Sequence, residues 1–170
     1  MIEAKLVPHP AHPPLSVQSI GVCVWRDVGR IHLRYLVEGA QQLILPAPAN
    51  PDRADDLWKT TCLEAFVGSD GTGYAEFNFS PSSQWAAYAF DAPRERMHSL
   101  GAEVEVWLEG GDDWIAVEAA VSVDLKQGAS LNLTAVIEEA GGHKSYWALA
   151  HPDGPPDFHD PSCFVARLPE

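Results

Sequence analysis

Basic residues are scarce in this sequence: 11 lysines and arginines stand against 24 aspartates and glutamates, which gives a formal net charge of −13. Nucleic-acid binding needs a basic surface that pairs with phosphates, and anionic membrane surfaces attract polybasic segments for the same reason. We therefore expect neither nucleic acid nor a membrane as a partner. The acidic balance favours solubility and does not by itself identify a ligand.

Cysteine is scarce as well. Cys23, Cys62 and Cys163 are odd in number and include no close pair, so we expect reduced thiols. The sequence contains no Cys-x-x-Cys spacing of the kind that a structural zinc site would need. The N-terminus lacks a basic segment followed by an apolar one, and no apolar run approaches the roughly 20 residues that span a bilayer. These absences predict a cytoplasmic location.

What the sequence does contain is a series of short apolar runs separated by turn residues. Its 14 prolines and 13 glycines are spread between these runs. In residues 30–38, Ile31, Leu33, Tyr35 and Val37 occupy every second position, a period that a helix cannot place on one face. About ten such runs follow one another, with no space for the crossover helices of a parallel sheet. We predict an all-β fold, an antiparallel two-sheet β-sandwich that is jelly-roll-like, with about ten strands.

The first 16 residues differ from the rest, because residues 9–14 read HPAHPP. Proline cannot donate a backbone hydrogen bond, so residues 1–16 are expected to form an extended N-terminal arm or a sheet edge. Residues 17–170 are then expected to form a single domain. Trp25, Trp107 and Trp114 lie in or at the start of alternating runs, and we expect them in its core.

Polar side chains in the central runs suggest a site. The period of two places Tyr74, Glu76 and Asn78 on one face of a strand and the intervening apolar residues on the other. Glu64 lies in the preceding apolar run, where a carboxylate is costly to bury unless it is paired or hydrogen-bonded. These residues predict a polar patch on one sheet face, which is either solvated or a ligand groove.

Nearby aromatic residues favour the groove. Sugars present apolar C–H faces, which a flat aromatic ring covers, and hydroxyls, which carboxylate, amide and guanidinium groups can bind. The aromatic candidates are Trp58, Trp85, Tyr88 and Trp147.

Several segments resemble a known family. They are LWKTTCLEAFV at residues 57–67, EFNFSP at 76–81, WAAY at 85–88, SYWALAHP at 145–152 and PDFHD at 156–160, followed by Phe164. Over most of the chain from about residue 17, the sequence resembles bacterial DOMON-like domains, which are similar to family 9 carbohydrate-binding modules.

The resemblance implies a β-sandwich or jelly roll with a ligand groove on one sheet. In the sugar-binding relatives, two tryptophans enclose the sugar, and acid, amide and arginine side chains bind its hydroxyls. Trp58 and Glu64 match one tryptophan–acid pair, Trp147 is the candidate for the second ring, and Arg94 or Arg96 for the cation. We expect a non-catalytic domain that binds a saccharide or related polar small molecule through Trp58, Glu64, Glu76, Asn78, Tyr88, Arg94 and Trp147.

Cofactors are not expected. Other DOMON relatives bind haem through an axial methionine and a histidine or lysine, which here requires Met97 with His32, His151 or His159. Structural calcium occurs in related modules, but Asp52, Asp55 and Asp56 lack EF-hand spacing. A haem-binding or redox domain and a protein-interaction module remain as alternatives.

Catalysis is weakly indicated. Glu64 and Glu76 could form a glycosidase acid pair, but nothing in the sequence fixes the separation that hydrolysis needs. No Gly-x-Ser-x-Gly elbow is present. His9, His12, His151 and His159 could share a metal only if the N-terminal arm folds against the late loop, and we expect isolated surface histidines. The sequence does not indicate an oligomeric state.

Overall fold

The computed structural model describes residues 1–69 and 71–169. The all-β prediction is confirmed: these residues form twelve strands, and their helical elements are three-residue 3₁₀ turns. The strands are β1 (Ile2–Pro8), β2 (Ser19–Asp27), β3 (Arg30–Glu38), β4 (Cys62–Gly68), β5 (Tyr74–Phe79), β6 (Trp85–Phe90), β7 (His98–Ser99), β8 (Glu103–Gly110), β9 (Trp114–Ser122), β10 (Ser130–Glu139), β11 (His143–Ala148) and β12 (Ala166–Arg167). The 3₁₀ turns are η1 (Ala40–Gln42), η2 (Leu57–Lys59), η3 (Ala140–Gly142) and η4 (Pro161–Cys163).

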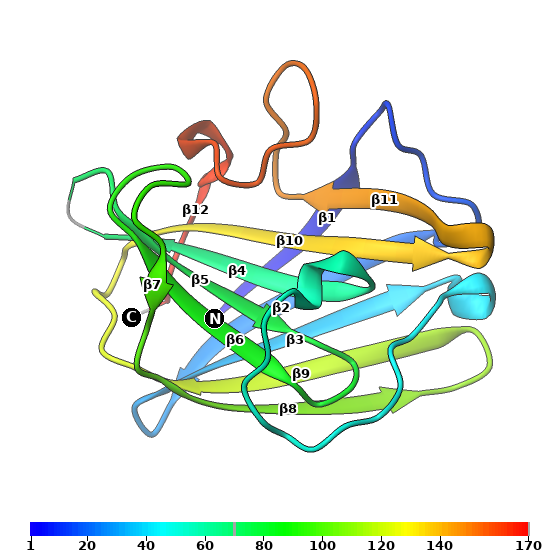
Figure 1. Ribbon diagram of the computed structural model, residues 1–170, viewed down its shortest axis with the longest axis horizontal. Coiled ribbons are helices and arrows are strands. Elements are labelled where there is room, and N and C mark those ends of the chain that lie inside the picture. Colours follow the sequence, from blue (N-terminus) through cyan, green and yellow to red (C-terminus); the bar gives the residue numbers. More distant parts are fainter. Residues whose placement is uncertain (70, 170) are drawn as a thin grey trace.

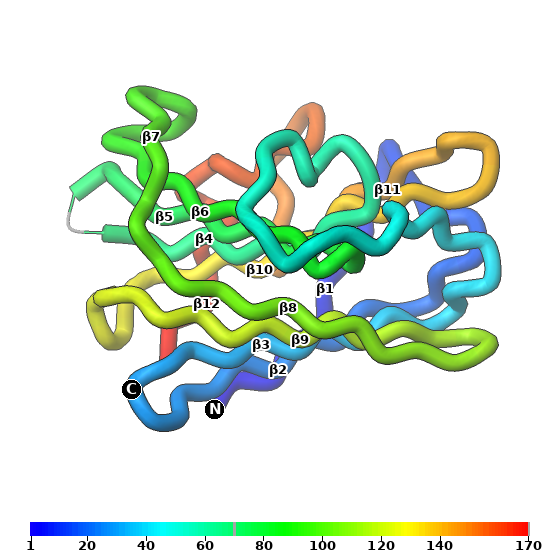
Figure 2. The backbone as a smooth tube through the Cα atoms, turned by 60° about the horizontal axis from the view of Figure 1, so that its bottom comes forward, coloured from blue at the N-terminus to red at the C-terminus, as the bar shows by residue number. Residues whose placement is uncertain are grey.

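The strands form one continuous antiparallel sheet that curls on itself, where two separate sheets were predicted. Its order is β7-β6-β5-β4-β10-β11-β1-β2-β3-β9-β8, with β12 beside β10. Strand β1 joins the two halves, because it pairs with β11 through Val7 and Pro8 and with β2 from Ile2 to Leu6. Figure 1 shows β1 and β11 side by side. In Figure 2, β8, β9 and β3 form one side of the molecule.

The hydrophobic core lies between the two halves of the curled sheet. Leu33 and Val117 come from the half made by β2, β3, β9 and β8, and Leu63, Phe77 and Leu133 come from the half made by β4, β5, β6 and β10. The period of two accounts for this arrangement, since every second side chain of a strand points to the same face. The side chains between these positions point to the opposite, outer face of each half.

The N-terminal segment is not an arm outside the sheet. Residues 2–8 form β1, with hydrogen-bonded neighbours on both sides. Proline is compatible with this position because Pro8 is the last residue of the strand.

A buried carboxylate fixes the segment that follows β1. Glu139, at the end of β10, accepts backbone hydrogen bonds from Leu15 (2.7 Å), Ser16 (2.6 Å) and Val17 (3.1 Å). Burial alone would raise the pKa of Glu139, but these donors and the Ser16 hydroxyl outweigh it and lower the pKa below its ordinary value. Residues 15–17 are therefore tied to the sheet by a charged acceptor.

The expected core positions of three tryptophans are wrong. Trp107 is 46% exposed and Trp114 is 38% exposed. Val104 and Val106 fill the inward positions of β8, so Trp107 points outward by strand alternation. Trp25 is partly buried on the outer face, where it stacks on His32 with ring centroids 5.1 Å apart.

Candidate functional site: a cavity on the outer face of the sheet

A cavity of about 1000 Å³ lies on the outer face of the β4–β5–β6–β10 half. Its floor comes from strands, and its walls come from residues 53–58, residues 94–99, residues 156–159 and His12. In Figure 2 the first three of these segments stand on the side of the molecule opposite β8 and β9. The volume is within the range of known small-molecule sites. We call it the outer-face cavity.

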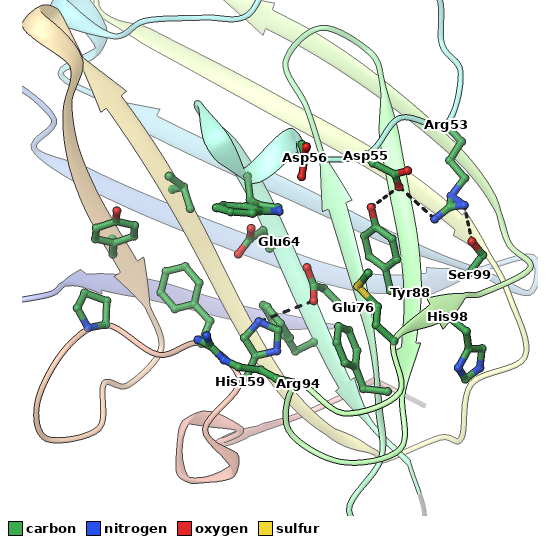
Figure 3. Close-up of a pocket in the computed structure, with 18 of the residues that line it drawn as sticks. Arg53, Asp55, Asp56, Glu64, Glu76, Tyr88, Arg94, His98, Ser99 and His159 are labelled. Carbon is green, nitrogen blue, oxygen red and sulfur yellow. Dashed lines mark hydrogen bonds and ion pairs between the residues drawn. The ribbon is translucent and has the colours of Figure 1, made fainter.

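Strand register brings five polar residues together, of which Glu64, Glu76 and Tyr88 line the cavity, whereas Asn78 and Thr134 are buried beside them and do not line it. Glu64 on β4 lies opposite Asn78 on β5 and Thr134 on β10, while Glu76 on β5 lies opposite Tyr88 on β6. All of these positions share one face, since directly paired residues of antiparallel strands point the same way. The predicted separation of Glu76 and Asn78 from Phe77 is therefore the observed one. Figure 3 shows Glu64 and Glu76 pointing into the cavity.

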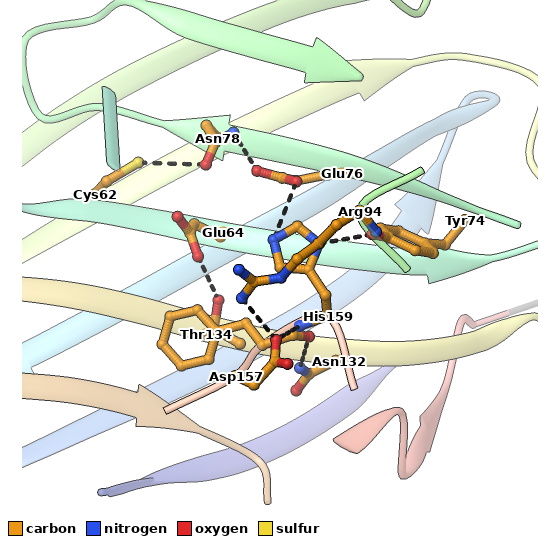
Figure 4. Close-up of polar contacts among 11 residues, drawn as sticks. Cys62, Glu64, Tyr74, Glu76, Asn78, Arg94, Asn132, Thr134, Asp157 and His159 are labelled. Atoms are coloured by element: carbon orange, nitrogen blue, oxygen red, sulfur yellow. Dashed lines mark hydrogen bonds and ion pairs between the residues drawn. The ribbon is translucent and has the colours of Figure 1, made fainter. Parts of the chain in front are cut away.

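The two carboxylates are buried and hydrogen-bonded only by neutral donors. Glu64 is 3% exposed and accepts from the Thr134 hydroxyl at its Oε2 atom (2.8 Å). Glu76 is 6% exposed and accepts from the Asn78 amide at its Oε1 atom (2.9 Å). Figure 4 shows both contacts. The remaining oxygens, Glu64 Oε1 and Glu76 Oε2, accept no hydrogen bond from the residues that the structure describes.

Burial raises the pKa values of both carboxyl groups. Burial, with the nearby charge of Glu76, raises the pKa of Glu64 from 4.5 to about 8. Burial also raises the pKa of Glu76, against opposing contributions from the Asn78 amide and Arg94. At neutral pH the pair therefore retains a proton, which Glu64 holds.

His159 is held neutral beside Glu76. The Tyr74 hydroxyl accepts from the Arg94 backbone N–H (3.1 Å) and lies 2.6 Å from His159 Nδ1. Donation from this hydroxyl leaves the imidazole proton on Nε2, which faces Glu76 Oε2 at 4.0 Å. Burial, then the charge of Arg94, lowers the pKa of His159 to about 4. The 4.0 Å gap is too long for a direct hydrogen bond and leaves room for a bridging group.

Arg94 is the arginine that reaches the cavity, of the two that the sequence left open. Its Nη2 atom donates to Asp157 Oδ1 (2.9 Å), which also accepts from the backbone of His159 (3.0 Å). Arg96 instead pairs with Asp91 (3.3 Å) and does not line the cavity.

A second polar group forms the opposite wall, and sequence reasoning missed its assembly. Tyr88 donates to Asp55 Oδ1 (2.6 Å), and the Arg53 guanidinium lies 5.1 Å from the centre of the Tyr88 ring. Arg53 also donates to Ser99 Oγ (2.7 Å). Arg53 and Asp55 come from a loop without periodicity, while Tyr88 lies on β6 and Ser99 on β7, and no pattern in the sequence signals their approach.

The aromatic residues of the site differ in part from those expected. Trp58 lines the cavity and is 50% exposed. Trp147 does not line it: this residue is 2% exposed in the core, where its Nε1 atom donates to Ser145 Oγ (2.9 Å). Its neighbour Tyr146, one position earlier on β11, faces the cavity. A shift of one residue along a strand reverses the face. Trp85 packs against the core.

Three histidines meet beside the cavity. The rings of His9 and His151 are 4.9 Å apart and those of His9 and His12 are 5.8 Å apart, so the N-terminal segment does fold against the late loop. Among residues 1–69 and 71–169, no group of three or more histidine, cysteine, aspartate or glutamate side chains is arranged to hold a metal ion. The same part of the chain contains no helix long and apolar enough to cross a membrane.

Comparison with known proteins gives a likeness of fold. No family model matches the chain, and no curated protein matches it. The structure is similar to the crystal structure of a "putative carbohydrate-binding protein" from Bacteroides uniformis, with a TM-score of 0.65. The match covers 95% of this chain and 83% of that one, at 17% sequence identity. The two chains therefore share a fold.

Proposed function

We propose that this protein is a saccharide-binding module that holds a sugar in the outer-face cavity without reacting with it. The observation that carries the proposal is the pair of buried carboxylates, Glu64 and Glu76, on the floor of a cavity that Trp58 lines from its rim. The name of the Bacteroides uniformis neighbour supports the same ligand class.

The geometry supplies what a sugar requires. The free oxygen atoms of Glu64 and Glu76 accept from hydroxyls, and His159 Nε2 donates into the space between it and Glu76. The indole of Trp58 offers a flat, half-exposed surface for the apolar face of a pyranose ring. The floor thus orients the ligand, and the ring covers it.

Within this function, we assign the chain to the DOMON-like group related to family 9 carbohydrate-binding modules. The spacing of Trp58 and Glu64 supports this assignment, as does the place of both residues at one cavity. The second tryptophan of those modules has no counterpart in Trp147. Tyr146 takes its place as the second ring.

Binding without catalysis follows from the placement of the two acids. Glu64 and Glu76 rise from adjacent strands of one sheet face, so both approach a ligand from the same side. Glycosidase carboxylates flank the scissile bond. We expect no release of reducing ends when the protein is incubated with oligosaccharides.

Mutation of Trp58 tests the proposal. Titration of the full chain with a panel of monosaccharides and peptidoglycan fragments is expected to change tryptophan fluorescence, with affinity in the millimolar to micromolar range that desolvation of sugars allows. Trp58→Ala should weaken binding at least about tenfold, the usual scale for loss of a central aromatic contact. Isothermal titration calorimetry measures the affinity of each variant.

The matched control is Trp107→Ala. Trp107 is 46% exposed, close to the 50% of Trp58, and lies on β8 in the other half of the sheet. It should leave affinity unchanged. A lack of response to every sugar, or equal losses in both variants, would contradict the proposal.

Haem is the alternative ligand, because Met97 and His159 line the same cavity. The fit of these residues to haem is poor: His159 Nδ1 is occupied by Tyr74, and Nε2 faces Glu76. Met97 is 60% exposed. Addition of haem to the purified protein should give no Soret band of a ligated iron, and such a band would favour the alternative.

A further inference from the structure

The carboxylate pair on the cavity floor lacks a cationic partner. No lysine or arginine that the structure describes lies within 4.0 Å of Glu64 or Glu76. The two arginines of the cavity are engaged elsewhere, Arg94 with Asp157 and Arg53 with Asp55. Among the described side chains, the Thr134 hydroxyl and the Asn78 amide are the donors that hydrogen-bond to the pair.

Histidine does not supply the missing charge. His159 is the nearest basic group, at 4.0 Å from Glu76, and burial keeps it neutral above a pKa of about 4. A carboxylate that is buried without a counter-charge is strongly unfavourable. The pair relieves this cost by retaining a proton, and a cation supplied by a ligand would relieve it in the same way.

The open acceptor sites suit an ammonium group. Glu64 Oε1 and Glu76 Oε2 have no hydrogen-bond donor among the described residues, and both side chains line the cavity. The two glutamates are diagonal neighbours on β4 and β5, since Glu64 pairs with Asn78, two residues beyond Glu76. Long side chains in that relation reach a common point. An ammonium has three donors that these two oxygens can accept, and its charge can replace the proton that the pair otherwise retains.

We infer that the outer-face cavity selects saccharides that carry a primary amine, with the ammonium seated between Glu64 and Glu76. This inference rests on the proposed function. The hydroxyls of such an amino sugar face His159 and the second wall, and its ring packs on Trp58. The net charge of −13 favours the approach of a cation.

Calorimetric titration of the full chain at pH 7 with glucosamine, glucose, N-acetylglucosamine and cyclohexylamine tests the inference. Glucosamine should bind at least about tenfold more tightly than glucose, the scale of one charge-assisted contact. N-acetylglucosamine, whose nitrogen is uncharged, should resemble glucose. Cyclohexylamine, which has the amine and ring size without the hydroxyls, should bind more weakly than glucosamine.

Acidification gives a test that needs no mutation. Burial raises the pKa of Glu76, so lowering the pH from 7 to 5 favours its protonation, and the preference for glucosamine over glucose should shrink as the charge of the floor is lost. His159 stays neutral in this range, because its pKa is about 4. Burial raises the pKa values of Tyr35, Cys62 and Tyr74, which therefore stay protonated. The other charged or titratable groups that line the cavity, or pair with its lining, are Arg53, Asp55, Asp56, Arg94, Asp157, His12 and His98.

Isosteric variants locate the seat of the amine. Glu76→Gln should reduce the glucosamine preference to near one, whereas Glu64→Gln should reduce it less, because the pKa of Glu64 is about 8 and its carboxyl group is mostly neutral at pH 7. The control Glu105→Gln, on β8 outside the cavity, should keep it. Circular dichroism establishes that each variant is folded, and the pH series on the unmodified chain decides the matter if one is not.

The outcomes separate the two proposals. Glucose and glucosamine binding with equal affinity would overturn amine selection and leave sugar binding intact. A preference that survives Glu76→Gln would overturn the proposed seat, and tight binding of cyclohexylamine would overturn the saccharide class. If none of the sugars binds, the proposed function itself fails.

Discussion

At the scale of single residues, Glu64 is both a proposed ligand-binding group and a buried carboxyl group that destabilises the folded chain when it ionises. Its carboxyl group lies on an apolar strand, 3% exposed, with one hydrogen bond from Thr134. Its pKa of about 8, against an ordinary 4.5, means that the folded chain favours the neutral acid. A group of this kind is kept at the expense of stability, as functional sites often are.

Replacement of this carboxyl group should stabilise the protein at alkaline pH. Because the folded-state pKa is raised, the favourable contribution of protonated Glu64 is complete below pH 4.5 and is lost as the pH rises through about 8. Glu64→Gln, which cannot ionise, should therefore be more stable than the unmodified chain at pH 9, by about 1–3 kcal/mol. Urea unfolding at pH 5 and pH 9 measures this difference. If the stability of Glu64→Gln relative to the parent were lower at pH 9 than at pH 5, the ionised carboxylate would not be disfavoured in the folded chain.

At the scale of elements, alternation predicted most of the strands and failed where its phase was ambiguous. The period of two placed Glu76 and Asn78 on one face correctly. On β11 the aromatic residues Tyr146 and Trp147 are adjacent, so by sequence either could point into the core. In the structure Trp147 does. On β8 the same ambiguity was resolved by Val104 and Val106 in the core, which left Trp107 outside. Side-chain identity alone does not determine the phase when large apolar residues are adjacent.

The loop walls were beyond prediction for a different reason. Arg53 and Ser99 are 46 residues apart in the sequence and meet by one hydrogen bond of 2.7 Å. Such contacts follow from tertiary structure and have no periodic signal. Strand β1 was missed because the prolines of residues 8–14 suggested an arm, although they begin only where the strand ends.

The link between β10 and the segment after β1 rests on Glu139. Glu139→Gln should destabilise the chain by about 2–3 kcal/mol, because the amide is a weaker acceptor and turns one donor toward backbone N–H groups. The pKa of Glu139 is lowered, so its stabilising contribution is present above pH 4.5 and is lost as the pH falls through the folded-state pKa. The difference between parent and variant in urea unfolding should therefore narrow with acidification. A constant difference from pH 7 to pH 3 would contradict this role.

At the scale of the whole molecule, β1 makes two halves into one sheet. It contributes pairing to both β11 and β2, and its Leu6 is buried in the core. A free arm could be removed without consequence, whereas a strand inside the sheet could not.

Deletion of residues 1–8 should therefore abolish cooperative unfolding, since it exposes two strand edges and opens the core. Near-ultraviolet circular dichroism during thermal unfolding detects the loss. If the shortened chain unfolded in an unchanged, cooperative transition, residues 1–8 would be a dispensable arm and not a structural part of the sheet.

The outer-face cavity and the hydrophobic core lie on opposite faces of the same strands. One set of alternate positions packs in the interior, while the other set lines the cavity together with the loops above it. Substitutions at the cavity positions can therefore accumulate without disturbing the packing of the core. This separation agrees with the fold that this chain shares with a structure of 17% sequence identity.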